Sequence, residues 1–178
     1  MTPPGVGGRV APGRLRGGGG LAGWLYAAAA GVYALDRASK LWAERALAGR
    51  PPLEIVPGVL QLTYTTNSGG AFGIGRAAPW LFASATVVVS ALIVAASFRV
   101  GRRGNALALG LILGGALGNL TDRVLRGPGI SGQVVDFIDL RVWPVFNLAD
   151  SAIVVGAAIL VLGGLRREEE DRRARGPA

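Results

Sequence analysis

The chain has 178 residues, of which 51% are hydrophobic, and its formal net charge is +8. Its mean hydropathy is +0.43, whereas a soluble domain of this length usually has more charge and less apolar content. The absence of Cys and His excludes disulfides, thiolate or imidazole zinc sites, and any catalytic triad built on a histidine base.

The positive charge has two interpretations, nucleic-acid binding or the flanks of membrane segments. The arginines lie beside apolar runs and form no continuous basic stripe with interleaved aromatic residues. This distribution favours the membrane interpretation. The predicted fold is therefore an all-α membrane protein.

Residues 1–20 are rich in Gly and Pro and carry three arginines, which predicts a flexible basic tail. Four apolar runs follow, and a membrane-spanning helix needs about 20 residues. Only the second run reaches that length without polar neighbours. We predict a four-span domain over residues 21–165 and a charged tail over 166–178, with the spans at about 21–40, 79–98, 104–123 and 146–165.

The first apolar run could instead belong to a cleavable secretory signal, since it has a basic flank and small residues. The segment from Asp36 to Lys40 follows at once and carries charges that suggest a functional role. We therefore favour a retained first span.

The connection between the first two spans has β-strand character. Residues 59–65 alternate, with Leu60, Leu62 and Tyr64 on one face, between two turn segments. This pattern predicts a small extracytoplasmic β-cradle at about residues 51–75. Between the last two spans, residues 126–132 are expected to form a mobile loop.

The positive-inside tendency places the basic segments before the first span, between the second and third, and after the fourth in the cytoplasm. Both termini are then cytoplasmic. The polar ends of three spans converge on the outer side, and they contain Asp36, Asn119, Asp122, Asn147 and Asp150.

Each of these residues also has an ordinary structural interpretation. Asn147 and Asp150 could cap the last helix, and Asp122 could pair with Arg123 in support of the fold. As a set they argue for chemistry, because a charged Asp at the centre of a span costs about 2.5–3.5 kcal/mol on insertion scales. Paired carboxylates that share a proton can hydrolyse a peptide bond without His or Cys. Spacing alone does not fix the pair, but Asp136 in the outer loop and Asp150 are sensible partners.

Five segments, in order along the chain, resemble the signature blocks of lipoprotein signal peptidases. They are Asp36-Arg37-Ala38-Ser39-Lys40, Asn67-Ser68-Gly69-Gly70-Ala71-Phe72, Gly114-Gly115-Ala116-Leu117-Gly118-Asn119-Leu120-Thr121-Asp122-Arg123, Val134-Val135-Asp136-Phe137-Ile138 and Phe146-Asn147-Leu148-Ala149-Asp150. The resemblance covers about residues 21–165.

The resemblance implies four membrane helices with a β-cradle and a catalytic pair formed by Asp136 and Asp150. It implies that Asn67, Asn119, Arg123 and Asn147 line the site, and that Asp36, Lys40 and Asp122 are structural support. The implied substrate is a prolipoprotein with diacylglycerol on its Cys, cleaved just before that Cys in the bacterial inner membrane. We also expect no cofactor, no metal and no nucleic acid, and a monomer in contact with membrane lipid.

Two alternatives use the same carboxylates. An ion- or proton-coupled transporter also buries carboxylates in a helical bundle, but the chain has no internal repeat. A Mg²⁺ or Ca²⁺ site could use Asp122, Asp136, Asp139 and Asp150, but no compact metal-loop spacing supports it.

Overall fold

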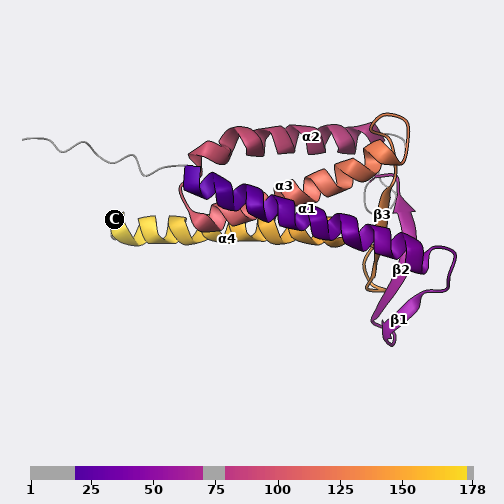
Figure 1. Ribbon diagram of the computed structural model, residues 1–178. Coiled ribbons are helices and arrows are strands. Elements are labelled where there is room, and N and C mark those ends of the chain that lie inside the picture. Colours follow the sequence, from indigo (N-terminus) through magenta and orange to yellow (C-terminus); the bar gives the residue numbers. More distant parts are fainter. Residues whose placement is uncertain (1–18, 70–78, 176–178) are drawn as a thin grey trace, which may run out of the picture.

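A computed structural model describes residues 19–69 and 79–175. Four long helices lie in the described residues, and a small sheet lies across one end of them (Figure 1). The helices are α1 (Gly19–Leu47), α2 (Pro79–Ala96), α3 (Arg103–Leu125) and α4 (Leu148–Arg175), and a short 3₁₀ turn, η2 (Ser97–Arg99), follows α2.

The prediction of a mainly helical membrane protein is confirmed at this level. Within the described residues, three helical segments are long and apolar enough to cross a membrane: Trp80–Arg99, Arg103–Leu125 and Leu148–Arg175. α1 is not one of them, and it carries Asp36, Arg37 and Lys40 in its second half. Both α1 and α4 are longer than the predicted spans, because α1 continues to Leu47 and α4 includes the charged segment after residue 165.

α3 is the central helix and packs closely against both α1 and α4. Glycine makes this approach possible. A Cβ atom on Gly114 would lie 2.5 Å from the backbone oxygen of Ala29 in α1, and one on Gly115 would lie 2.5 Å from that of Ala149 in α4. α3 can therefore hold side chains from α1 and α4 in one place.

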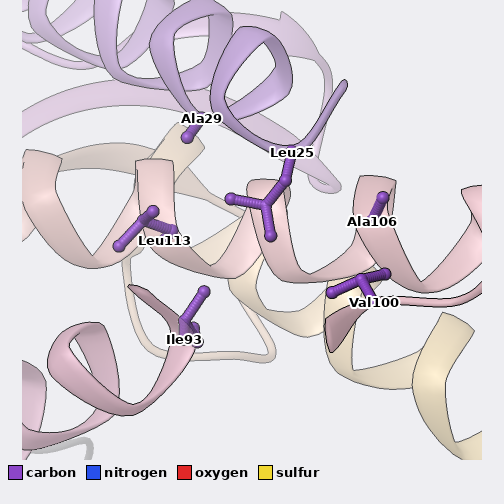
Figure 2. Close-up of a cluster of buried hydrophobic side chains, with 6 residues drawn as sticks. All are labelled: Leu25, Ala29, Ile93, Val100, Ala106 and Leu113. Carbon is purple, nitrogen blue, oxygen red and sulfur yellow. The ribbon is translucent and has the colours of Figure 1, made fainter. Parts of the chain in front are cut away.

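The apolar core of the bundle lies away from the sheet. It contains Leu25 and Ala29 of α1, Ala106 and Leu113 of α3, and Ile93 and Val100 from α2 and the segment after it (Figure 2).

The sheet has three antiparallel strands in the order β1 (Leu53–Val56), β2 (Leu60–Asn67) and β3 (Val134–Asp139). Leu62 and Tyr64 of β2 pack with Phe137 against the end of α1, so the predicted strand and its apolar face are present. β3 was predicted only as an apolar-acidic segment. Residues 1–18 of the predicted tail, 70–75 of the predicted cradle and 176–178 lie outside the described residues.

Candidate active site

The ends of α3 and α4 meet the sheet at a cavity of about 270 Å³. Six of the residues singled out in the sequence line it or bond to its carboxylates. The lining includes Asn67, Asn119, Arg123, Asp136 and Asp150, and Asn147 lies directly behind them.

Asp136 is placed by the register of the sheet. In the antiparallel β2–β3 pair, Thr65 lies opposite Asp136 and Asn67 lies opposite Val134. Asn67 and Asp136 are therefore diagonal neighbours on one face of the sheet, within reach of each other. A side-chain hydrogen bond joins them.

Asn147 immediately precedes α4 and caps it. Its Oδ1 accepts a hydrogen bond of 2.9 Å from the backbone N–H of Asp150, as an N-cap side chain does. Its Nδ2 lies 2.6 Å from Oδ1 of Asp136 and 3.2 Å from Oδ1 of Asn119. The structural interpretation of Asn147 is thus correct, and the same side chain also contacts a candidate catalytic carboxylate.

Asn119 completes a chain of hydrogen bonds between the two aspartates. Its Nδ2 donates to Oδ1 of Asp150 at 2.8 Å. The order of contact is Asp136, Asn147, Asn119 and Asp150, so two carboxamides connect the two carboxylates. This arrangement holds both acids at one cavity.

The two aspartates differ in exposure. Asp136 is only 2% exposed, whereas Asp150 is half-buried. Burial, and then the nearby charge of Asp150, raise the pKa of Asp136 to about 7, although hydrogen bonds from Asn147 and Asn67 oppose the rise. Asp136 therefore retains a proton up to nearly neutral pH.

Arg123 adds a buried cation to the lining. Its Nη1 donates to the backbone oxygen of Asn119 at 3.3 Å, and its Nε has no hydrogen-bond partner among the described residues. Arg123 therefore has a free donor beside the cavity.

A layer of ion pairs lies next to the cavity, on the side of α1. The fully buried Lys40 lies 2.8 Å from Asp36 and 3.1 Å from Asp122, and its Nζ donates to Oδ1 of Asn119 at 2.8 Å. Asp36 also accepts the backbone N–H of Ala149 at 3.0 Å. The layer thus joins α1, α3 and the start of α4.

Asp122 forms no ion pair with Arg123 in the described structure, so the alternative of a supporting Asp122–Arg123 pair does not hold. Its oxygens instead contact Arg37, Lys40, Arg126 and the backbone N–H of Val135. Arg123 lies on the other side of the helix end, towards the cavity. One residue along a helix turns the side chain by about 100°, which separates the two neighbours.

The four aspartates considered as metal ligands do not gather in one place. Asp139 contacts Gln61 and Arg141 on the sheet, and Asp122 is held by three cations. Within the described ranges, no group of three or more acidic, Cys or His side chains is arranged to hold a metal ion.

Several contacts of the site were not predicted. Arg37 pairs with Asp122, and Arg126 makes two hydrogen bonds of 2.9 Å to Glu44. Phe82, Trp143 and Phe146 line the cavity. The i, i+4 spacing of Asp122 and Arg126 was a usable signal for one of these contacts. The others join segments that are distant in sequence.

Known proteins are similar to this chain over most of its length. A family model described as signal peptidase (SPase) II matches residues 28–166. The chain is 44% identical over 152 residues to a lipoprotein signal peptidase of Streptomyces coelicolor, which covers 83% of this chain and 72% of the relative. It is 40% identical over 145 residues to one of Desulfitobacterium hafniense, which covers 80% and 93%.

Solved structures of similar shape include one titled "Bacterial membrane enzyme structure by the in meso method at 2.3 A resolution". That structure superposes with a TM-score of 0.72 and 28% sequence identity, over 83% of this chain and 91% of the other. The fold of the described residues is therefore shared with a membrane enzyme.

Proposed function

The chain belongs to the signal peptidase II family, and from this we propose that it removes signal peptides from bacterial prolipoproteins with Asp136 and Asp150 as the catalytic pair. It is a peptidase by family membership. The proposed substrate carries diacylglycerol on a Cys, and cleavage falls just before that Cys. The lipoprotein signal peptidases that it resembles support this assignment.

The observation that carries the assignment of the pair is the hydrogen-bonded chain through Asn147 and Asn119. It joins two carboxylates from different elements at one cavity. An acid pair needs two carboxyl groups held close together with different proton affinities. Burial, which raises the pKa of Asp136 to about 7, favours a proton on that acid.

In the proposed reaction, Asp136 begins protonated because its pKa is raised to about 7. Asp150 draws a proton from a water molecule as the water attacks the scissile carbonyl carbon. Asp136 hydrogen-bonds the carbonyl oxygen during the attack. A carboxyl group of the pair then gives a proton to the departing amine as the C–N bond breaks.

Arg123 and Asn67 are proposed to position the substrate. Both line the cavity, and the unpartnered Nε of Arg123 is suited to a backbone carbonyl of the signal peptide. Asn119 and Asn147 are proposed to orient the two aspartates through hydrogen bonds. Lys40 in turn donates a hydrogen bond to Asn119 and is paired with Asp36 and Asp122.

The proposed topology has four spans, with α1 as the first, and both termini in the cytoplasm. Three helical segments are apolar enough to span, and α1 packs along α3 for much of its length. The site and the sheet then lie near the outer leaflet of the inner membrane, with the sheet as the β-cradle. We propose that the enzyme acts as a monomer.

A transporter is less well supported, since the family match is to a peptidase. In the described structure, the buried carboxylates are gathered at one end of the bundle around Lys40 and the cavity. A carrier would need polar sites that reach both sides of the membrane.

The test replaces each acid with its neutral isostere in cells that lack their own lipoprotein signal peptidase. Asp136→Asn and Asp150→Asn should each abolish prolipoprotein processing while the protein still inserts into the membrane. Asp139→Asn is the matched control, because Asp139 lies on the same strand but contacts Gln61 and Arg141 instead. Cleavage by either site variant at the native rate would show that the pair is wrong, and loss of activity in a chelator would favour a metal enzyme.

A further inference from the structure

A second cavity, of about 380 Å³, lies at the far end of the bundle from the active site. It lies between the start of α3 and residues 159–170 of α4, and the final turns of α4 extend beyond the other helices (Figure 1). Its polar lining comprises Arg102, Asn105, Arg166, Arg167 and Glu170.

The lining changes from apolar to basic along α4. Ile159, Leu162 and Arg166 follow one another at i, i+3 and i+7, so they share one face of the helix. Ile159 and Leu162 line the cavity together with Arg166 and Arg167, which lie further towards the C-terminal end of α4. Leu162 is 57% exposed, so the apolar side of the cavity is open to its surroundings.

The guanidinium groups at this cavity have no partner within the described part of the chain. The side chains of Arg102, Arg166 and Arg167 make no hydrogen bond or ion pair with other described residues, while Arg173 nearby pairs with Glu169. Glu170 offsets one of the three charges and leaves the lining net positive.

The positive-inside tendency explains why arginines occur on this side of a membrane protein. It does not explain why three of them, two from α4 and one from the residue before α3, line one partly apolar cavity without ion-pair partners among the described residues. Basic pockets between membrane helices on this side are suited to phospholipid head groups. The planar guanidinium group of arginine can donate two parallel N–H hydrogen bonds to the oxygens of one phosphate.

We propose that this cavity binds an anionic glycerophospholipid of the cytoplasmic leaflet. The phosphate contacts Arg102 and Arg166, and an acyl chain lies along Ile159 and Leu162. The site is separate from the active site, and the inference rests on the proposed membrane orientation. Phosphatidylglycerol is the probe, because it combines one phosphate charge with two acyl chains.

The experiment measures the melting temperature of the purified full chain in a neutral detergent as phosphatidylglycerol is added. The lipid should raise the melting temperature in a saturable way, and phosphatidylcholine with the same acyl chains should not. In Arg102→Gln/Arg166→Gln, the half-effective concentration of phosphatidylglycerol should rise at least about fivefold for each lost charge.

The control is Arg172→Gln/Arg175→Gln, which removes the same charge from α4 outside this cavity and should stay within about twofold of the wild type. A helical circular dichroism spectrum and an unchanged melting temperature without lipid show that the variants are folded.

Equal losses in both double variants would overturn the proposal, because binding would then follow general surface charge. An equal shift with soluble glycerol phosphate would also overturn it, since the ligand would be a free phosphate. No substrate is present, so failure here is distinct from failure of the proposed peptidase activity.

Discussion

Nζ of the fully buried Lys40 donates a hydrogen bond of 2.8 Å to Oδ1 of Asn119. The same oxygen accepts from Nδ2 of Asn147, so the amide of Asn119 has only one orientation in which both donors are satisfied. Its Nδ2 must then point towards Asp150, where it donates at 2.8 Å. The ion-pair layer thus fixes the direction of a bond to a catalytic carboxylate.

Asn119→Ala should lower kcat/KM by roughly 10²-fold, because a misplaced reacting group commonly costs that much. The protein should remain folded, since Lys40 keeps its ion pairs with Asp36 and Asp122. Cleavage of a prolipoprotein substrate by the purified enzyme measures the effect. Gln133→Ala, which removes an exposed carboxamide, is the control, and equal rates for both variants would contradict the role of Asn119.

The rate should depend on pH through Asp136. The pKa of Asp136 is raised to about 7 by burial and by the charge of Asp150, and the proposed mechanism needs its protonated form. The protonated fraction is near one well below pH 7 and falls about tenfold per unit above it, so kcat/KM should fall as pH rises beyond about 7. A pH–rate profile of the purified enzyme tests this. A rate that stays level to pH 9 would show that Asp136 does not act as the acid.

Lys40→Met should destabilise the protein strongly. Removing one partner of a buried ion pair costs roughly 3–5 kcal/mol, because the other charge is left uncompensated, and Lys40 serves both Asp36 and Asp122. Adding Asp36→Asn should recover part of the loss by removing one of the stranded charges. Unfolding in a detergent titration measures both variants. Arg173→Gln breaks the exposed pair with Glu169 and should leave the midpoint unchanged.

The sequence predicted the elements of the site better than their contacts. Polar residues at the ends of apolar runs are rare, and this pattern identified Asp36, Lys40, Asn119 and Asp122. The four helices follow from the apolar runs themselves. The third strand was missed because Val134 to Ile138 reads equally well as an interfacial loop, and only pairing with β2 makes it a strand.

Long-range ion pairs could not be predicted for the same reason. Arg37 and Glu44 lie on α1, and their partners Asp122 and Arg126 lie on α3. Nothing in the local pattern specifies the rotation of one helix about the other. That rotation is set by close packing at glycines, which the sequence shows only as a Gly-rich block.

Gly114→Ala tests whether that packing positions the site. The added Cβ would lie 2.5 Å from the backbone oxygen of Ala29 and 2.8 Å from Cβ of Val32, so α1 and α3 would have to separate. Overpacking of this kind typically costs about 1–3 kcal/mol. The rate should fall as well, because the contact from Lys40 on α1 to Asn119 on α3 depends on the same separation.

Gly31→Ala is the matched control on α1, since its added Cβ would have no neighbour within 4 Å, and alanine favours a helix more than glycine does. The unfolding midpoint and the prolipoprotein cleavage rate should both drop for Gly114→Ala and stay level or rise slightly for Gly31→Ala. If Gly114→Ala lost stability but kept its rate, the separation of α1 and α3 would not control the site.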